Sequence, residues 1–570
     1  MKKILNTLAL IFTLTLLSAY AHAQKTTLQW ATYFGGDTLT YSNNIVKDSS
    51  GNLYIAGLTY SDSGIATKGA YKTLGDSANG DAFLAKFSPS GNLLWATYFG
   101  GEGSDNEAGL AIDKDGNVCI SGWTNSDSGI ATSGAYKTKS DIGGNNAFLV
   151  KFSPSGSLLW GTYYGRNIEN VEVGVVAIDS SNNIYITGTT FSMSGIVTKG
   201  AYQTLGDSIN GNVFLAKFNS AGNLLWGTYY GDSDEGWSIA AYGSNIYITG
   251  ETFSTYGNAT SSAYQTSGGG AYLANFSSNG TLLWATYYGG QDYSNSVATD
   301  MFGNIYIAGG VDGTAPGIAT SGAYQTSYGG GLSDGFLAKF NPVGNLLWGT
   351  YFGGSGDDVA GGTSFDATGN VYLAVTTSST SGIATMGAYQ TSYGGGSAEG
   401  VITKFNPNGN IIYSTYYGGN GEDQTLSITA NDSSDVYIVG YTNSTYGIAT
   451  SGAYQILNNG TSYEAFLAKF NVPIYTDIET SNTQSACFEI FPNPFSAQTA
   501  ISYQLFTSSN VQIEILDLEG KLIAFLTDEK ELSGNYTNTF NAEKYNMPAG
   551  VYFVRVCTDG QVITKKINKL

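Results

Sequence analysis

One pattern recurs along most of this sequence at intervals close to 65 residues. The phrase LQWATYFGG around Trp30 returns in similar form six more times, and successive central aromatic residues lie 65, 65, 66, 58, 64 and 65 residues apart. These central residues are Trp30, Trp95, Trp160, Trp226, Trp284, Trp348 and Tyr413. The phrases GNLYIAG, GAYKT or GAYQT, and FLAKF keep the same phase. Self-similarity at a fixed period is typical of repeat architectures and constrains the fold more than any local motif.

Each repeat unit contains four strand-like runs, which in the second unit are residues 109–113, 117–121, 148–152 and 158–164. Short turns rich in Gly, Pro, Asp and Ser join the first run to the second and the third to the fourth, so these runs are expected to form hairpins. A long connection, residues 125–146, carries the GAYKT phrase. The 77 glycines and 42 tyrosines fit this all-β interpretation, because tight turns use Gly and strands favour aromatic residues.

Four-stranded units repeated seven times predict a seven-bladed β-propeller over residues 28–470. An open β-solenoid is the alternative, but its repeats are normally much shorter and it needs polar end caps. The phase of the repeat favours a closed ring. The first strand, residues 28–35, has no partner next to it in sequence, and the last unit ends on residues 466–470 without the strand that should follow. We therefore expect these two segments to pair and to remove an open sheet edge.

The N-terminus has the pattern of an export signal. Lys2 and Lys3 precede an almost wholly apolar run, residues 4–17, and Ala21-His22-Ala23 resembles a cleavage site, which predicts a signal peptide over residues 1–23. The alternative, a membrane-spanning helix, needs roughly 20 apolar residues. We expect an exported mature chain without a transmembrane segment.

Charge and rare residues exclude several classes of function. The 44 acidic and 24 basic residues give a net charge of −20, which disfavours binding to nucleic acid. The single histidine, His22, lies in the expected signal peptide, so histidine-dependent catalysis and histidine-ligated metals are excluded from the mature chain. Cys119 replaces a strand tyrosine and is expected to be an inert, buried residue, whereas Cys487 and Cys557 could pair with each other.

The repeat ends near Asn471. Residues 471–485 are expected to be a linker, and residues 486–570 contain six short strand-like runs with turn signals at Glu519-Gly520 and Asp559-Gly560. This pattern predicts a small antiparallel β-sandwich that is separate from the repeat.

Both regions resemble known families. The W-x-T-Y-x-G-G, G-N-x-Y-I-x-G, G-A-Y-Q-T and F-L-A-K-F phrases resemble the SBBP repeat, a β-propeller repeat of exported bacterial proteins, for which the resemblance implies no general catalytic set. The C-terminal region resembles the type A sorting domain of type IX secretion. The resemblance rests on motifs that include Pro492, Asn493, Pro494, Gly550, Lys565 and Lys566. It implies the type IX secretion machinery as a partner, followed by release or surface attachment. An ordinary immunoglobulin-like accessory domain is the alternative.

Acidic loops follow the LLW-type strands. Carboxylates combined with carbonyl groups of Gly-rich turns suit Ca²⁺, so calcium is a possible ligand, although no cofactor is required. The candidate ligands are Asp105, Asp234, Asp292, Asp357 and Asp423. Their irregular spacing from the preceding aromatic residue favours the alternative that they are solvated turn residues.

Aromatic residues offer a second kind of site. The GAYQT tyrosines are expected to pack the long connection onto its own unit rather than to bind sugars, and the repeated tryptophans are expected in the core between units. Trp123 and Trp237 lie outside the repeat positions, so they are the candidates for a specific surface contact.

These observations favour a non-catalytic binding or scaffold module at the cell surface, whose partner is an extracellular glycan or protein. The alternatives are a carboxylate-dependent glycoside hydrolase or lyase, and a calcium-dependent carbohydrate-binding adhesin. A hydrolase needs two carboxylates that face each other across a cleft, one of them with a raised pKa. No residue of this sequence is assigned a catalytic role.

Overall fold

The computed structural model describes residues 26–140, 144–168, 173–290, 292–313, 317–430, 434–459, 462–472, 488–505, 509–518, 520–532, 534–558 and 561–570. The chain divides into two compact units, Met1–Ile474 and Tyr475–Leu570. The expected signal peptide lies outside the described residues, and so does nearly all of the expected linker.

The described part of the first unit forms seven antiparallel sheets of four strands each. Sheet 1 contains β2 (Thr40–Lys47), β3 (Leu53–Thr59), β4 (Asp81–Phe87) and β5 (Leu93–Phe99). Sheet 2 contains β6 (Asp105–Ile112), β7 (Val118–Thr124), β8 (Asn145–Phe152) and β9 (Leu158–Ile168). Sheet 3 contains β10 (Val173–Ile178), β11 (Ile184–Thr190), β12 (Asn212–Phe218) and β13 (Leu224–Tyr230). Sheet 4 contains β14 (Asp234–Tyr242), β15 (Asn245–Thr252), β16 (Gly270–Ser277) and β17 (Leu282–Tyr288).

Sheet 5 contains β18 (Asp292–Thr299), β19 (Ile305–Asp312), β20 (Ser333–Phe340) and β21 (Leu346–Phe352). Sheet 6 contains β22 (Asp358–Phe365), β23 (Val371–Thr377), β24 (Glu399–Phe405) and β25 (Ile411–Tyr417). Sheet 7 contains β26 (Asp423–Ala430), β27 (Asp435–Thr442), β28 (Glu464–Asn471) and, from the other end of the unit, β1 (Thr27–Phe34). The strand runs and hairpins expected from the repeat therefore correspond to strands of the structure.

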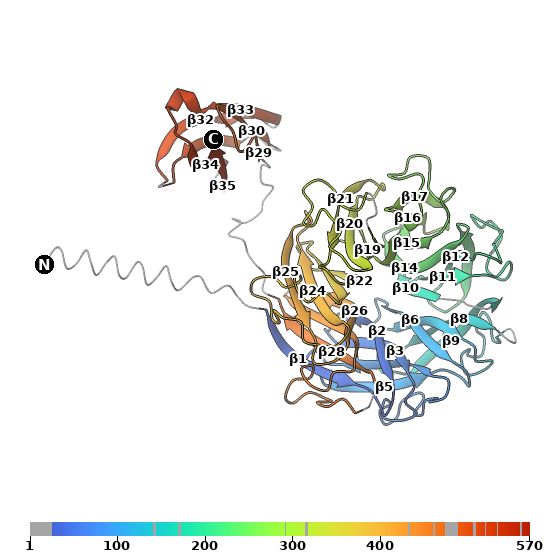
Figure 1. Ribbon diagram of the computed structural model, residues 1–570. Coiled ribbons are helices and arrows are strands. Elements are labelled where there is room, and N and C mark those ends of the chain that lie inside the picture. The colour runs from blue at the N-terminus through green and yellow to red at the C-terminus, as the bar shows by residue number, and fades with distance from the viewer. Residues whose placement is uncertain are drawn as a thin grey trace. The chain divides into compact units, whose positions relative to one another are not determined.

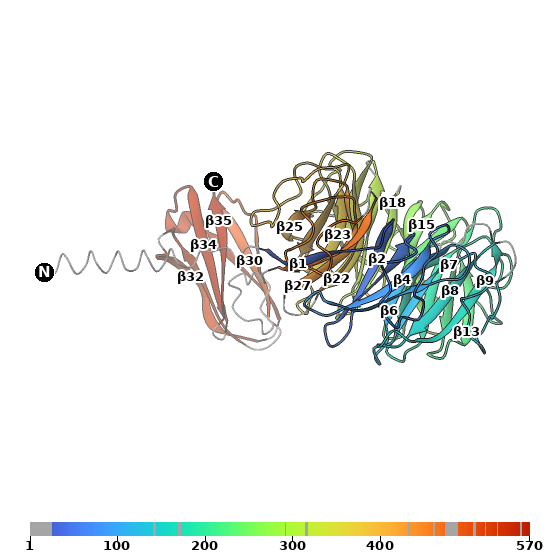
Figure 2. The same ribbon diagram turned by 90° about the horizontal axis from the view of Figure 1, so that it is seen from below.

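The sheets are arranged radially, with the labelled first strands β2, β6, β10, β14, β22 and β26 closest to the middle of the unit (Figure 1). Each of these inner strands contacts the inner strand of the next sheet, and β26 contacts β2. The strand β1 pairs with β28 in an antiparallel register in which Ala31 lies opposite Ala468. Figure 2 shows β1 and β27, the two strands that flank β28 in this sheet, in the same region of the unit.

The core lies between neighbouring sheets, which is why the second and third strands are buried on both faces. In β4, for example, every residue from Asp81 to Phe87 is buried. Hydrophobic clusters extend across the seams between sheets, and one of them joins Phe34 and Val439 of sheet 7 to Ile55 and Phe87 of sheet 1. Burial of both sheet faces produces the continuous apolar runs seen in the sequence.

The repeated tyrosines connect neighbouring sheets. Tyr71 stacks on Phe99 of its own sheet and makes an edge contact with Phe152 of the next sheet, at centroid distances of 6.3 and 6.0 Å. The same contact with the next sheet is made at Tyr136–Phe218, Tyr202–Phe276, Tyr264–Phe340, Tyr324–Phe405, Tyr389–Phe470 and Tyr454–Phe87. The expectation that each tyrosine packs the long connection onto its own unit leaves out this second contact, in which the ring bridges to the next sheet.

The second unit contains a three-stranded and a four-stranded sheet. The first sheet has β29 (Phe488–Phe491), β30 (Gln498–Leu505) and β33 (Gly534–Asn541), and the second has β31 (Ser509–Leu516), β32 (Leu522–Glu531), β34 (Gly550–Thr558) and β35 (Gln561–Lys569). A short 3₁₀ helix, η1 (Ala542–Tyr545), follows β33. Buried residues of both sheets, such as Ile501 and Val554, share one core.

Candidate functional site

Four of the five acidic residues that were candidates for calcium binding are the first residues of inner strands, and they are buried. Asp105, Asp234, Asp292 and Asp423 are each at most 1% exposed. Asp357 is different, because it is exposed on the loop before β22 and the buried residue at the repeat position is Asp358. The alternative of solvated turn acids is therefore wrong for the buried residues.

Hydrogen bonds explain why these carboxylates are buried. Asp423 accepts hydrogen bonds from the Thr442 hydroxyl, from Ser444 Oγ at 2.9 Å and from the Gly419 amide at 2.7 Å. Asp105 and Asp358 have the equivalent set of two hydroxyls and one amide. The carboxylate thus fixes the entry loop to the end of the second strand.

Among the described residues, no three His, Cys, Asp or Glu side chains are grouped so that they could hold a metal ion. Calcium binding therefore remains a prediction, and the hydrogen bonds of these carboxylates favour a structural role.

Burial raises the pKa of several of these groups. The pKa of Asp105 is raised to about 6 and that of Asp234 to about 7, in both cases mainly by desolvation and against the opposing effect of their hydrogen bonds. Cys119 is buried as predicted, and burial raises its pKa to about 12. Cys557 is a free thiol, and Cys487 lies outside the described residues.

One end of the sheets carries the residues that differ most between units. These residues form opposed pairs, and in each pair the second residue of the inner strand lies opposite a residue near the end of the neighbouring strand of the same sheet. We call the set of these pairs the variable end. The described pairs are Tyr41–Leu58, Asn106–Trp123, Glu235–Glu251, Tyr293–Gly310, Val359–Thr376 and Gln424–Tyr441.

Of the two predicted contact residues, Trp123 belongs to the variable end and Trp237 lies beside it, two residues after Glu235. Trp123 is half-buried opposite Asn106. Trp237 is half-buried at a bulge of β14, where its Nε1 donates to Glu235 Oε2 at 3.0 Å and its ring meets Tyr293 of the next sheet at 5.5 Å. The inner strands of five other sheets have a bulge at the equivalent point, where the residue is not a tryptophan, so Trp237 is distinguished by its side chain and not by the backbone.

Sequence reasoning missed a cluster of three tyrosines between sheets 7 and 1. The rings of Tyr41 and Tyr441 are 4.7 Å apart, and Tyr463 lies 5.3 Å from Tyr441 and 6.0 Å from Tyr41. The Tyr463 hydroxyl donates to Glu422 Oε2 at 2.8 Å. These residues were hidden among many tyrosines, and a position-by-position comparison of the units would have revealed Tyr41 and Tyr441.

Acidic side chains gather beside Trp237. Burial raises the pKa of Glu251 to about 7, and the nearby carboxylates of Glu235 and Asp312 raise it further. In sheet 2, burial raises the pKa of Glu107 to about 8, and its Oε1 accepts a hydrogen bond from Asn44 Nδ2 at 3.1 Å. The acids are therefore distributed unevenly among the sheets.

The sorting-motif residues of the second unit join its two ends. Asn493 Nδ2 donates to the Lys566 carbonyl and Asn493 Oδ1 accepts from the Asn568 amide, both at 2.9 Å. Gly550 begins β34, and Lys565 and Lys566 are exposed on β35. Pro492 and Pro494 flank Asn493 in the segment that leads from β29. The sequence motif thus corresponds to one structural connection.

Comparison with known families assigns both units. Residues 29–64, 94–129 and 283–309 match the Beta-propeller repeat (SBBP), and residues 489–569 match the Secretion system C-terminal sorting domain. The chain therefore carries β-propeller repeats and a type IX sorting domain, which indicates export to the cell surface or the extracellular space. In the described part of the chain, no helix is long and apolar enough to cross a membrane.

Individual proteins are only distantly similar. An uncharacterized WD repeat-containing protein, L264 of Acanthamoeba polyphaga mimivirus, is 24% identical over 580 residues, which cover 84% of this chain and 41% of that protein. The Trypanosoma rangeli sialidase in complex with the inhibitor DANA is 8% identical, with a TM-score of 0.34 over 95% of this chain and 88% of its own. The Xanthomonas campestris gluconolactonase XC5397 is 11% identical, with a TM-score of 0.26 over 61% of this chain and 96% of its own. Likenesses this weak carry no argument about activity.

Proposed function

We propose that the first unit is a closed, seven-bladed β-propeller that acts outside the cell as a non-catalytic binding module and is delivered there by its sorting domain. In this proposal residues 1–23 are a signal peptide, residues 28–470 the propeller, residues 471–485 a linker and residues 486–570 the sorting domain. The type IX secretion machinery is then the partner during export, and a glycan is the ligand afterwards.

Contacts between sheets 7 and 1 support the closed ring. The Trp30 Nε1 of β1 donates to the Pro89 carbonyl of sheet 1 at 3.1 Å, as Trp95 does to Pro154 of sheet 2 at the same distance. Tyr454 meets Phe87 at 6.1 Å, the same edge contact that joins the other sheets. Since this seam uses the contacts of the other seams, sheets 7 and 1 are neighbours in the same sense as any other pair.

The single observation that carries the binding function is the concentration of variable aromatic residues at one end of the sheets. The residues shared by all units are enough to build a scaffold. Specific contacts with a ligand require residues that differ between the units. Trp123, Tyr293 and Tyr441 do so at the variable end, and the ring of Trp237 lies 5.5 Å from that of Tyr293. Trp and Tyr offer an apolar ring face and a polar edge, and they are enriched at binding surfaces.

The neighbouring polar groups favour a glycan over a purely apolar partner. Glu235, Glu251 and Gln424 lie in the same layer as the aromatic rings. Carboxylates accept hydrogen bonds from sugar hydroxyls, while ring faces pack against the apolar faces of pyranoses.

The experiment is a binding screen of the mature, full-length chain on immobilised glycans with a Trp237→Ala variant. We expect the variant to lose at least about tenfold in affinity, as for a residue at the centre of a binding surface. Tyr242→Ala is the matched control, because Tyr242 lies at the opposite end of the same strand, β14. Equal binding by wild type and Trp237→Ala would contradict the proposal. Repeating the screen with a calcium chelator tests the adhesin alternative.

A glycoside hydrolase is the second candidate, and the acids beside Trp237 favour it. Glu251 has the raised pKa that a general acid needs, with Glu235 as a neighbouring carboxylate. However, Glu235 and Glu251 are cross-strand neighbours on one sheet, whereas the carboxylates of a hydrolase flank the bond from two sides. Hydrolysis of any polysaccharide by the wild type that is abolished in Glu251→Gln would establish the hydrolase and contradict the non-catalytic role.

A further inference from the structure

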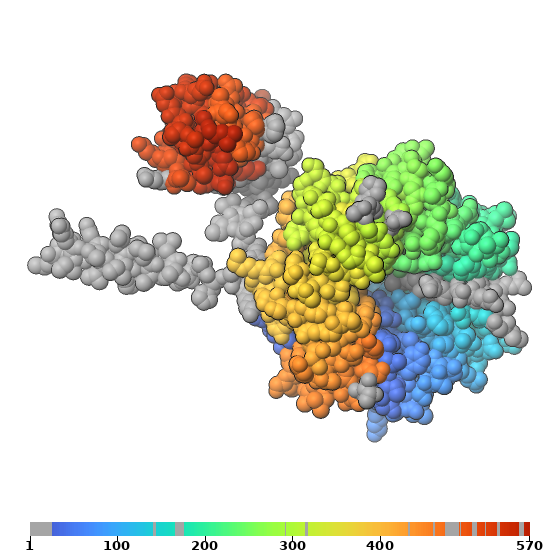
Figure 3. Space-filling model, in the orientation of Figure 1, coloured from blue at the N-terminus to red at the C-terminus, as the bar shows by residue number. Residues whose placement is uncertain are grey.

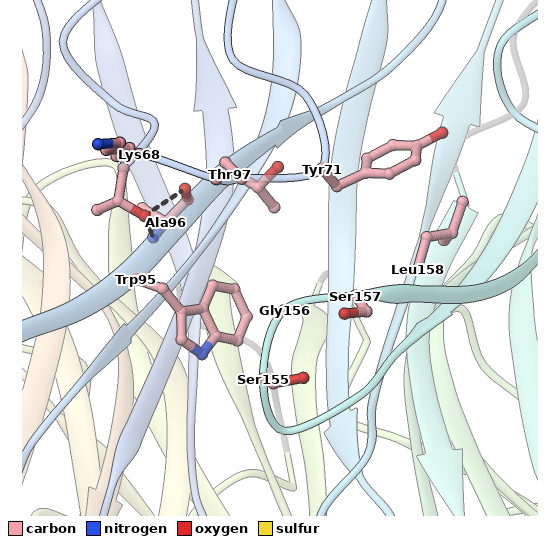
Figure 4. A pocket seen from close by; sticks show the side chains of 12 residues that line it. Lys68, Tyr71, Trp95, Ala96, Thr97, Ser155, Gly156, Ser157 and Leu158 are labelled. Carbon is pink, nitrogen blue, oxygen red and sulfur yellow. Dashed lines mark hydrogen bonds between the residues drawn. The ribbon is translucent and has the colours of Figure 1, made fainter.

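A pocket of about 450 Å³ lies at the seam between sheets 1 and 2, away from the variable end. Figure 4 shows Lys68, Tyr71 and Trp95 of sheet 1 around it, together with the turn of sheet 2 that carries Ser155 and Ser157. We infer that this pocket is a binding site for a neutral polysaccharide, and that the five other seams with the same tryptophan–turn contact offer equivalent sites. The inference goes beyond the variable end, because it concerns a different surface.

The tryptophan of the pocket is held in place by the turn of the next sheet. Trp95 Nε1 donates to the Pro154 carbonyl at 3.1 Å, and the indole lies against Gly156. Gly156 has φ +84°, and a Cβ at this position would lie 2.9 Å from the indole. The glycine therefore permits a close contact that fixes the ring before any ligand binds, which lowers the entropic cost of binding.

The tyrosine of the pocket stays half exposed although it packs on two phenylalanines. Tyr71 is 46% exposed. The equivalent values at the other seams that have a tryptophan are 45% for Tyr136, 48% for Tyr202, 43% for Tyr264, 39% for Tyr324 and 47% for Tyr454. A ring that served packing alone would be expected to become buried in at least some units. Its uniform exposure favours a surface that is used.

The seam between sheets 6 and 7 differs and serves as an internal comparison. No hairpin turn connects β28 to β1, since the two strands come from opposite ends of the unit. The tryptophan is replaced there by Tyr413, which is fully buried and whose hydroxyl accepts a hydrogen bond from the Tyr389 amide at 3.4 Å. Tyr389 is more buried than the other repeated tyrosines. Within the described residues, a half-exposed tyrosine beside a half-buried tryptophan therefore occurs at the seams where a turn contacts the tryptophan.

The chemistry of the lining selects a neutral, hydroxyl-rich ligand. Aromatic rings offer faces to a pyranose, and Ser155, Ser157 and Lys68 offer hydrogen-bonding groups. The net charge of −20 disfavours polyanionic glycans. Equivalent sites at six seams would suit a ligand that itself repeats, because several weak contacts along one polymer raise the overall affinity.

The test titrates the mature, full-length chain with β-1,4-linked hexasaccharides of glucose, xylose and mannose and with the matching soluble polymers. A bulky residue on the turn should block a pocket without removing a packing contact, so the single variant is Ser157→Tyr. The full variant adds tyrosine at the equivalent positions Asn92, Asn223, Thr281, Asn345 and Asn410. Ser50→Tyr, on the exposed β2–β3 turn, is the control.

We expect one of these hexasaccharides to bind at more than one site per chain, and Ser157→Tyr to remove one of those sites. The full variant should bind the polymer about 100-fold more weakly or worse. Unchanged melting temperatures show that each variant is folded. No binding of any of these glycans, a single site, or unchanged polymer affinity in the full variant would overturn the inference. Polymer binding that survives the full variant but is lost in Trp237→Ala would overturn it while supporting the proposed function.

Discussion

Buried carboxylates are the most informative single residues of this protein. Asp105, Asp234 and Asp423 were candidates for metal binding, yet hydrogen bonds to hydroxyl, amide or side-chain N–H groups show them fixing the entry loops. Their burial has a consequence for stability, because burial raises the pKa of Asp105 to about 6 and of Asp234 to about 7.

A carboxyl group whose pKa is higher in the folded state binds its proton more tightly there. It therefore contributes stability that is complete below its unfolded pKa, near 4, and is lost as the pH rises through 6 and 7. We expect the melting temperature of the propeller to be a few degrees higher at pH 5 than at pH 8.

Asp234→Asn should reduce this pH dependence, because the variant lacks the carboxyl group whose pKa is raised. Asp207→Asn, at an exposed carboxylate whose hydrogen bonds lower its pKa, should leave the pH dependence between 5 and 8 unchanged. Thermal unfolding of the three proteins across this range provides the check. A melting temperature that rises from pH 5 to pH 8 would contradict the prediction that ionising the buried carboxyl groups destabilises the folded protein.

Repeat position predicts some side-chain roles well and others poorly. Cys119 is buried as expected, because it replaces a buried strand tyrosine. Asp357 was chosen over Asp358, because adjacent acids cannot be distinguished by spacing when loop lengths vary. The pairing of Lys151 with Asp113 at 2.7 Å was also not foreseen. In sheet 4 the residue equivalent to Lys151 is Asn275 and the residue equivalent to Asp113 is Tyr242. Only a comparison of the units would have revealed that both members of this ion pair are replaced.

At the scale of elements, hairpin turns fasten each sheet to the previous one. In sheet 2 the contact is made by Gly156 against Trp95. Gly156→Ala should destabilise the propeller through the unfavourable φ, about 1–2 kcal/mol, and through a further steric clash of about 1–3 kcal/mol.

Gly134→Ala provides the matched comparison. Gly134 has φ +82°, but no atom lies within 4 Å of the position that a Cβ would occupy. It should therefore show only the cost of the unfavourable φ. Denaturant unfolding of both variants measures the difference, and equal destabilisation would mean that the indole contact adds nothing.

The strand β1 is the element whose role was most specifically expected from the sequence. A chain that begins at Gly35 should be less stable by several kcal/mol than one that begins at Thr26, since it loses Trp30 and exposes the edge of β28. We expect a lower melting temperature and concentration-dependent association. Addition of a peptide of residues 26–36 should restore the melting temperature, and an unchanged melting temperature of the shortened chain would contradict this role.

Strand positions followed from the sequence because the repeat shows each of them several times. The binding layer did not, because a site is made of the residues in which the units differ. Trp123 and Trp237 were identified because they lie outside the repeat positions of tryptophan, whereas Tyr41, Tyr441 and Tyr463 were not identified among the many tyrosines. Their contacts connect segments about 400 residues apart, which no local pattern reveals.

For the whole molecule, the account depends on the first strand completing the last sheet, so that the sheets close into one ring and hold the variable layer rigid. In this arrangement six of the seven seams repeat the same tryptophan–turn contact, and the aromatic residues of the variable end form a fixed surface. Closure is thus the premise of both binding proposals.

The most direct measurement is a disulfide cross-link between β1 and β28. Ala31 and Ala468 are opposed in the strand register and both are buried, so Ala31→Cys with Ala468→Cys, in a chain with Cys487 and Cys557 replaced by Ser, should oxidise to a disulfide. Mass spectrometry of the digested protein should find the linked pair and calorimetry a raised melting temperature. Ala31→Cys with Ala85→Cys, which places the second thiol in sheet 1, should remain reduced. Absence of the 31–468 link, or equal linking of both pairs, would contradict the closed ring.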